Sequence, residues 1–125
     1  IMLNNVRLNG GVYLDDIIYD ISGISSLENQ LVPATFIMSQ NFPNPFNPTT
    51  RIKYGLPENS QVRLTVFDIK GRTVRTLVNS IQTAGWHEVE WDGLDDSNEL
   101  LPTGVYLARI EAKGFSNVIK MIHLQ

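Results

Sequence analysis

Hydrophobic and polar side chains alternate along most of the chain after residue 50. Val62, Leu64 and Val66, for example, occupy every second position of the segment 61–68. Successive side chains of a β-strand point to opposite faces, so a period of two predicts strands with one buried face. The same pattern predicts further strands over residues 51–56, 73–79, 86–91, 105–112 and 116–125.

Turn-forming residues separate these predicted strands at short intervals. Gly71 and Gly114, for example, each follow a lysine between two apolar runs, where a tight hairpin turn needs a positive φ. No helical period appears in the sequence. We therefore predict an all-β fold, an immunoglobulin-like antiparallel β-sandwich of about six to seven strands. The side chains expected in its core include Val89, Trp91, Tyr106, Ala108 and Ile110.

Prolines mark a boundary ahead of the predicted sandwich. Five of the six prolines lie between Pro33 and Pro57, where each restrains its neighbour to extended geometry. Before them, residues 12–19 (VYLDDIIY) are typical of a single strand, which cannot bury a face alone. We predict a stub or last strand of a preceding cargo domain over residues 1–21, a linker over 22–39 and the sandwich over 40–125.

Composition and charge narrow the classes of function. The formal net charge is -3, which provides no positive field for phosphates, so we expect no nucleic-acid partner. The chain has no cysteine, which excludes a disulfide framework and a thiolate metal site. No apolar run reaches the roughly 18 residues that a membrane span requires, so we expect no membrane insertion. The chain begins with Ile1 and lacks the layout of a signal peptide, so we expect it to be a fragment of a longer protein.

Five short motifs follow one another in the second part of the chain. They are residues 41–50 (NFPNPFNPTT), 68–74 (DIKGRTV), 84–93 (AGWHEVEWDG), 103–106 (TGVY) and 120–125 (KMIHLQ). Together they resemble the type A C-terminal sorting domains of the type IX secretion system, and the resemblance covers residues 40–125. The W-D-G and G-V-Y motifs also resemble the immunoglobulin-like domain of flagellar hook-capping proteins. Several motifs in one order are far more specific than any one of them.

The resemblance implies a non-catalytic secretion signal. Sorting domains of this kind are recognised in the periplasm by the type IX translocon and direct an attached N-terminal cargo through the outer membrane. A sortase commonly cuts in the linker before the domain. The resemblance therefore implies a secreted or cell-surface protein of the Bacteroidota or related phyla, with translocon and sortase proteins as partners and no cofactor. Exposed strands also leave a homodimer open.

Two segments are the candidate recognition sites. One is the terminal segment Lys120, Met121, Ile122, His123, Leu124 and Gln125, and the other is Asn44, Pro45, Phe46, Asn47 and Pro48. Side chains alternate along a strand, so Lys120, Ile122 and Leu124 share one face and their neighbours share the other; one set is expected in the core and the other toward partners. We also expect the last strand to reach Gln125 and to leave backbone groups open for strand addition.

The opening segment also has a structural interpretation, which we favour. Prolines and asparagines are first of all turn formers, so residues 44–48 would be a rigid lead-in to the sandwich. Phe42 and Phe46 would then plug the edge of the sandwich.

Three other groups of residues suggest chemistry, and each has a simpler interpretation. The acidic stretch 92–99 offers oxygen ligands for calcium, but its spacing is not that of an EF-hand, so we favour a solvated loop and predict no metal site. Trp86 either packs or stacks on a sugar ring, which gives the alternative function of a carbohydrate-binding or adhesive module. His87 and Glu88 point to opposite faces of one strand, so we find no catalytic constellation and predict that the protein is not an enzyme.

Overall fold

The computed structural model describes residues 32–125, which contain β-strands and no helix. The predicted strand over residues 12–19 and the predicted cargo stub over 1–21 lie outside the described residues. The all-β class predicted from the alternating pattern is confirmed. The strands are β2 (Ile37–Met38), β3 (Thr50–Leu56), β4 (Ser60–Phe67), β5 (Thr73–Gln82), β6 (Gly85–Trp91), β7 (Gly104–Ala112) and β8 (Phe115–His123).

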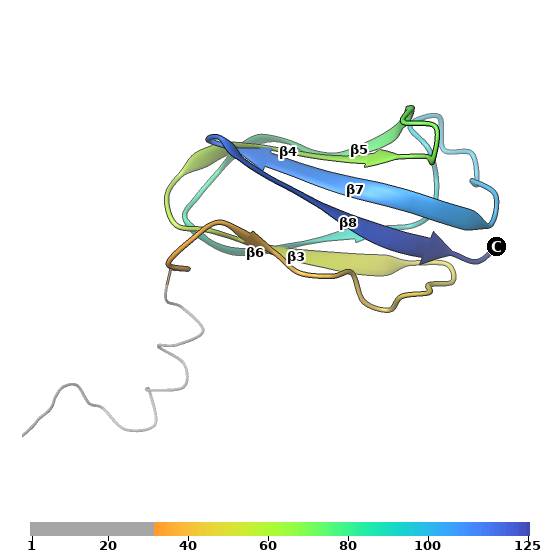
Figure 1. Cartoon of the computed structure of the whole chain (residues 1–125), viewed down its shortest axis with the longest axis horizontal. Helices are drawn as coiled ribbons and strands as arrows, with labels where there is room; N and C mark the ends of the chain where they lie inside the picture. Colours follow the sequence, from red (N-terminus) through yellow and green to blue (C-terminus); the bar gives the residue numbers. More distant parts are fainter. Residues whose placement is uncertain (1–31) are drawn as a thin grey trace, which may run out of the picture. The chain divides into compact units, whose positions relative to one another are not determined.

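The strands form two antiparallel sheets that pack face to face as an immunoglobulin-like sandwich (Figure 1). One sheet has the order β2-β3-β6, and the other has the order β5-β4-β7-β8. The chain crosses between the sheets after β3, β5 and β6, so neither sheet is built from one continuous run of strands. Residues 32–125 contain no helix that is long and apolar enough to cross a membrane.

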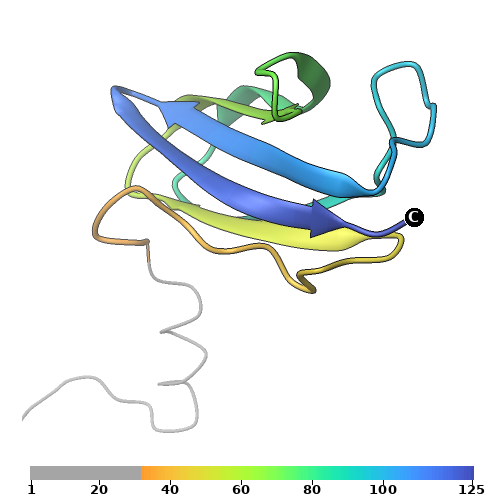
Figure 2. The same cartoon turned by 45° about the vertical axis from the view of Figure 1, so that its right-hand side comes forward.

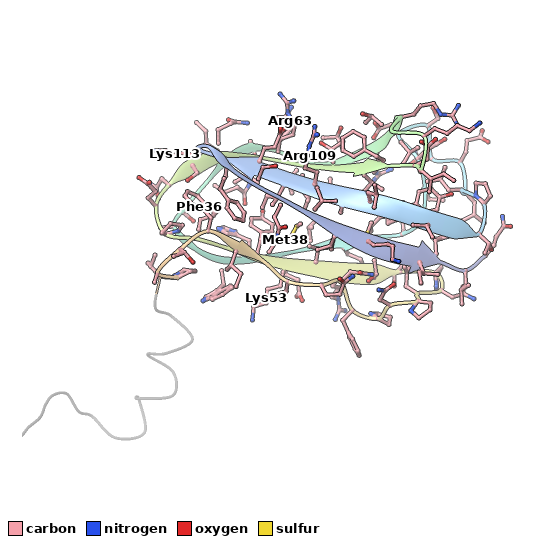
Figure 3. All side chains as sticks on the ribbon, viewed as in Figure 1. Phe36, Met38, Lys53, Arg63, Arg109 and Lys113 are labelled. Carbon is pink, nitrogen blue, oxygen red and sulfur yellow. The ribbon has the colours of Figure 1, made fainter. Side chains whose placement is uncertain are left out.

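Alternate side chains of the paired strands fill the space between the sheets. In β7, Tyr106, Ala108 and Ile110 are buried as predicted, and so is Trp91 at the end of β6. Val89 is half-buried and packs against this core. Figure 3 shows Phe36 and Met38 between the two layers, whereas Arg63 and Arg109 point away from the four-stranded sheet. The other fully buried apolar side chains include Phe46, Ile52, Leu56, Val62, Leu64, Val66 and Met121.

The strands differ from the prediction by more than one residue in three places. β5 continues beyond residue 79, because its pairing with β4 extends to Gln82 opposite Ser60. β8 ends at His123 and does not reach Gln125, whose N–H donates to the Thr103 hydroxyl at 2.8 Å instead of to the backbone of β7. Residues Ile37–Met38, in the range expected to be linker, pair with β3. The sandwich therefore includes residues that precede Gln40.

The core makes a direct prediction for stability. Replacing Ile110, which is 1% exposed, by alanine removes buried methyl groups and leaves a cavity. We expect Ile110→Ala to lower the free energy of unfolding by about 2 to 5 kcal/mol in a denaturant titration. Ile81→Ala is the control, because Ile81 is 75% exposed, and should change stability by no more than about 0.5 kcal/mol. Equal effects of the two substitutions would contradict the assignment of the core.

Candidate recognition surface

The structure brings the two predicted recognition segments together at one edge of a sheet. β8 is the last strand in the order β5-β4-β7-β8, so one side of its backbone faces away from the sheet. Residues 41–46 run along this side, near the C-terminal end of β8 (Figures 1 and 2). Phe46 and His123 form a parallel bridge there. The opening segment thus acts as a partner for the end of β8.

Asn44 and Phe46 supply the hydrogen bonds that a neighbouring strand would supply. The Asn44 Oδ1 atom accepts from the Ile122 N–H at 2.8 Å. The Phe46 N–H donates to the Ile122 carbonyl and the Leu124 N–H donates to the Phe46 carbonyl, both at 2.9 Å. The backbone of the terminal segment is therefore paired within the chain. The prediction that these groups are open for strand addition is wrong for Ile122 and Leu124.

Asn41 holds the opening segment in its position. Its Nδ2 atom donates to the Pro43 carbonyl at 3.1 Å and to the Thr50 Oγ1 atom at 2.9 Å, and the Thr50 hydroxyl donates to the same carbonyl at 2.8 Å. Both side chains are buried. Phe42 and Arg51 also exchange two backbone hydrogen bonds at 2.9 Å. Because these bonds fix the backbone on both sides of Pro43, the segment is preformed for its contact with β8.

Four aromatic rings from four different motifs pack together under this contact. The ring centroids of Phe46 and His123 are 4.9 Å apart, those of Phe46 and Trp91 are 5.4 Å apart, and those of Trp91 and Tyr106 are 5.6 Å apart. All four side chains are buried. The Trp91 indole N–H and the Tyr106 hydroxyl each donate to a backbone carbonyl, at 2.9 and 2.7 Å. Four of the five motifs that carry the sequence resemblance therefore meet in one cluster.

His123 differs from Trp91 and Tyr106 in the hydrogen bonding of its polar ring atoms. Neither ring nitrogen has a hydrogen-bond partner within residues 32–125. Burial lowers the pKa of His123, and only the nearby Pro102 carbonyl opposes that shift. The ring packs directly against Gly93, where an added Cβ atom would overlap Nε2, and Gly93 has a φ of 78°. The glycine of the W-D-G motif is thus required by the close approach of His123 as well as by its backbone conformation.

Alternate residues of the terminal segment divide between core and surface, as predicted. Met121 and His123 are fully buried, Lys120 and Leu124 are exposed, and Ile122 is half-buried. Two of the predicted recognition residues therefore have their side chains inside the sandwich. Only the other members of the segment present a side chain to a partner.

The opening segment is divided in the same way. Phe46 is 1% exposed and plugs the edge of the sandwich, as predicted. Phe42 is 79% exposed, so the prediction that it shares this role is wrong. The exposed members of the predicted recognition segment are Asn44, Pro45, Asn47 and Pro48.

The acidic loop covers part of the opposite edge of the same sheet. The Asp96 N–H donates to the Val74 carbonyl at 2.9 Å, and Asp96 Oδ1 accepts from the Thr76 N–H at 3.2 Å. Both partners belong to the edge strand β5. The carboxylate of Asp95 accepts N–H bonds from within the loop, at Ser97 and Glu99. The sequence predicted a solvated loop, and the structure gives the loop the further role of capping β5; residues 32–125 contain no cluster of three potential metal ligands.

Asp68 has a structural role in the second motif. Its Oδ1 atom accepts from the backbone N–H groups of Lys70 and Arg72 at 2.9 and 3.0 Å, and its Oδ2 atom accepts from Arg72 Nε at 2.8 Å. The hydrogen bond from the Arg72 backbone outweighs the opposing effect of desolvation and, with the other two bonds, lowers the pKa of Asp68. The D-x-x-G-R motif is therefore the hydrogen-bonded turn between β4 and β5.

Comparison of the sequence with protein families gives one match. Residues 42–114, more than half of the chain, match the FlgD Ig-like domain. The chain belongs to this family. The matched range of the FlgD Ig-like domain contains the second, third and fourth motifs, so the predicted relationship to hook-capping proteins is confirmed. A search of curated proteins finds no match.

Solved structures share the fold of this FlgD Ig-like domain. Dimeric latent PorU from Porphyromonas gingivalis matches with a TM-score of 0.58 and 20% identity, over 74% of this chain and 10% of PorU. PorZ, described as an essential surface component of the type IX secretion system of the same organism, matches with a TM-score of 0.50 and 17% identity, over 82% of this chain and 12% of PorZ. FlgD from P. aeruginosa is 30% identical over 59% of this chain and 60% of its own, with a TM-score of 0.45. The chain spans only about a tenth of the length of PorU and PorZ.

The contact of Asn44 with β8 predicts a local change in protection. Asn44→Ala removes the acceptor of the Ile122 N–H, so we expect faster amide hydrogen exchange at Ile122 and a loss of stability of about 1 kcal/mol. Asn59→Ala is a matched control, because Asn59 Oδ1 accepts from the Ala84 N–H at 2.8 Å, far from β8 in the sequence. The control should leave exchange at Ile122 unchanged. If both variants changed the exchange rate at Ile122 equally, Asn44 would not be the group that protects the Ile122 amide.

Buried His123 predicts a pH dependence of stability. In the unfolded chain its pKa is near 6.5, and in the folded protein it is lower. Between these two values the unfolded state binds more protons, so stability should fall as pH decreases below about 6.5. His123→Leu should abolish this decline in unfolding titrations across pH, whereas the control His87→Gln should retain it. The lowered pKa of Asp68 affects stability in a separate pH range, because its contribution is lost only as the pH falls below about 3.9. A decline that persists in His123→Leu would contradict the assignment.

Proposed function

We propose that this domain is a non-catalytic C-terminal secretion signal that directs an attached cargo protein through the outer membrane by the type IX secretion system. The observation that carries this proposal is the contact between the opening motif and the terminal segment, through Asn44 and Phe46 on one side and Ile122 on the other. The shared fold with PorZ, described as a component of that system, supports it.

A signal of this kind must present the same side chains whatever cargo it carries. Phe46 and Asn44 fix the register of the end of β8, and Met121 and His123 anchor it in the core. The side chains of Lys120, Ile122 and Leu124, which share the outward face, are thereby held in place before a partner binds. Because little side-chain and backbone freedom remains to be lost on binding, such preorganisation favours recognition.

The proposed route places the cargo before the sandwich and the translocon at its surface. A sortase then cuts the chain between residues 22 and 35, or the cargo is released whole, which makes the mature protein secreted or attached to the cell surface. The host is a member of the Bacteroidota or of a related phylum. These steps come from the resemblance of the motifs, and the PorZ likeness is consistent with the location.

The surroundings of the two histidines are those of packed side chains, which fits a binding role better than a catalytic one. His123 is fully buried in the aromatic cluster. The ring of His87 stacks on Tyr54 at 5.3 Å, and its Nε2 atom lies 2.7 Å from the Thr83 carbonyl. Among residues 32–125, neither imidazole has a hydrogen bond or ion pair with a nucleophile or a carboxylate, which the known triad arrangements require.

Carbohydrate binding through Trp86 is the alternative function. Trp86 is 40% exposed on the outer face of the three-stranded sheet, which favours an aromatic platform. Its ring, however, already covers Gly55, where a Cβ atom would lie 2.9 Å from Cζ3. The Lys53 Nζ atom lies over the ring at 5.1 Å from its centroid. Because its own chain already occupies the ring, we favour the secretion function.

Export of a fusion protein tests the proposed function. We expect a reporter fused to the N-terminus of the full chain to reach the medium or the cell surface in a host with a type IX system. The same fusion should remain in the periplasm of a host that lacks the translocon, and so should the reporter alone in the competent host.

Retention of the fusion in the competent host would contradict the secretion function. Retention together with polysaccharide binding that is lost in Trp86→Ala would favour the alternative. Deletion of residues 120–125 is a poor test, because it removes the buried side chains of Met121 and His123, and we expect this loss to destabilise the whole domain.

A further inference from the structure

The N-terminal half of β8 lacks the cover that its C-terminal half has. The N–H and C=O groups of Ile122 make their hydrogen bonds on the side of β8 that faces away from β7. Val118 and Lys120 lie at alternate positions of the same strand, so their N–H and C=O groups point to that side too. Within residues 32–125 the Val118 carbonyl and the Lys120 N–H have no hydrogen-bond partner. The Val118 N–H bonds only to the neighbouring Asn117 side chain, at 2.9 Å. The cover ends at the Lys120 carbonyl, which accepts from Gln40 Nε2 at 2.7 Å.

An apolar groove lies beside this uncovered stretch, on the outer face of the four-stranded sheet. Its volume is about 220 Å³. The register of β7 and β8 places Val118 opposite Arg109 and Lys120 opposite Leu107. Val118 is 49% exposed at the edge of the groove. The groove is lined by Phe67, Gly71, Leu107, Arg109 and Val118.

This face is positively charged, although the chain as a whole is negative. Arg63 and Arg109 share one carboxylate, that of Glu111, at 3.9 and 3.7 Å. Lys120 has no ion pair within the part of the chain that the structure describes. The Arg109 guanidinium lies over the Phe67 ring, and its Nε atom is buried with no hydrogen-bond partner among those residues. Figure 3 shows Arg63 and Arg109 projecting from this side of the sandwich.

We propose that β8 between Ser116 and Lys120 is the docking edge for an extended acidic segment of a partner protein. The inference rests on the proposed function and names the part of the domain that the partner contacts. The segment adds a strand to the sheet, donating to the Val118 carbonyl and accepting from the Lys120 N–H. It carries a carboxylate beside Lys120 and, two positions away on the same face, an apolar side chain beside Val118.

The charge of the face argues for an acidic partner and against a second copy of this chain. Pairing of β8 with β8 of another molecule would bring two positive faces together, and like charges across neighbouring strands are destabilising. An acidic strand instead supplies a carboxylate for Lys120. Docking on this half also leaves the contact of Phe46 with β8 intact.

Two variants of the full chain remove the edge and the charge separately. Val118→Pro puts a proline ring in place of an outward N–H, and the ring blocks the approach of an added strand. The bonds to β7 from the residues on either side remain, and proline is tolerated where an edge N–H faces solvent. Lys120→Glu reverses the charge without changing the backbone. Lys70→Glu, at the exposed turn between β4 and β5, is the matched charge control. Thermal unfolding of each variant tests whether the fold is retained.

The probe is a short synthetic peptide in which valine and aspartate alternate on one face, separated by threonines. In NMR titrations we expect it to shift the Val118 and Lys120 amides of the unmodified chain. Its affinity should fall at least about tenfold, or about 1.4 kcal/mol, in Val118→Pro and in Lys120→Glu, and stay unchanged in Lys70→Glu. A peptide with lysine in place of aspartate should bind more weakly.

Several results would overturn the docking edge. These are absence of binding to the unmodified chain, equal binding of the two peptides, and a concentration-dependent dimer that Val118→Pro abolishes. In the export assay, both variants should reduce export several-fold while Lys70→Glu exports normally. Normal export of Val118→Pro would overturn the inference and leave the secretion function standing. Failure of the unmodified fusion would overturn the secretion function, while the peptide titration would still decide the docking edge.

Discussion

The pairing of Phe46 with the end of β8 is the interaction on which the rest of the structure depends. An edge strand of a sheet exposes a row of unpaired backbone groups that invites uncontrolled association. This domain covers part of that row with its own opening segment, through two backbone bonds at 2.9 Å. The Phe46 side chain simultaneously enters the core and contacts His123. One residue therefore covers the end of this edge and closes one end of the sandwich.

The same principle operates at the other edge of the four-stranded sheet. There the acidic loop bonds to β5 through Asp96. Both edges of this sheet are thus partly covered, and on β8 the stretch before Lys120 is the part that lacks cover within residues 32–125. A partner that pairs with β8 is thereby directed to this stretch.

The alternating pattern was sufficient to predict the strands and the division of β8 into an inner and an outer face, because both follow from the geometry of a single strand. The role of Asn44 was beyond that reasoning. Its side chain bonds to a backbone group 78 positions away, and such a contact leaves no local pattern in the sequence. Phe42 and Phe46 stand in one motif, and only the three-dimensional path of the chain decides that one is exposed and the other buried. Ile37–Met38 is too short to show a period, so its pairing with β3 also escaped prediction.

Solution NMR of the full chain tests most directly whether the opening segment sits on β8. Nuclear Overhauser effects between the ring protons of Phe46 and His123, together with effects between the Asn44 side chain and the Ile122 amide, are the result that the structure requires. A Phe46 ring without contacts to His123, in a sandwich that is otherwise folded, would contradict it.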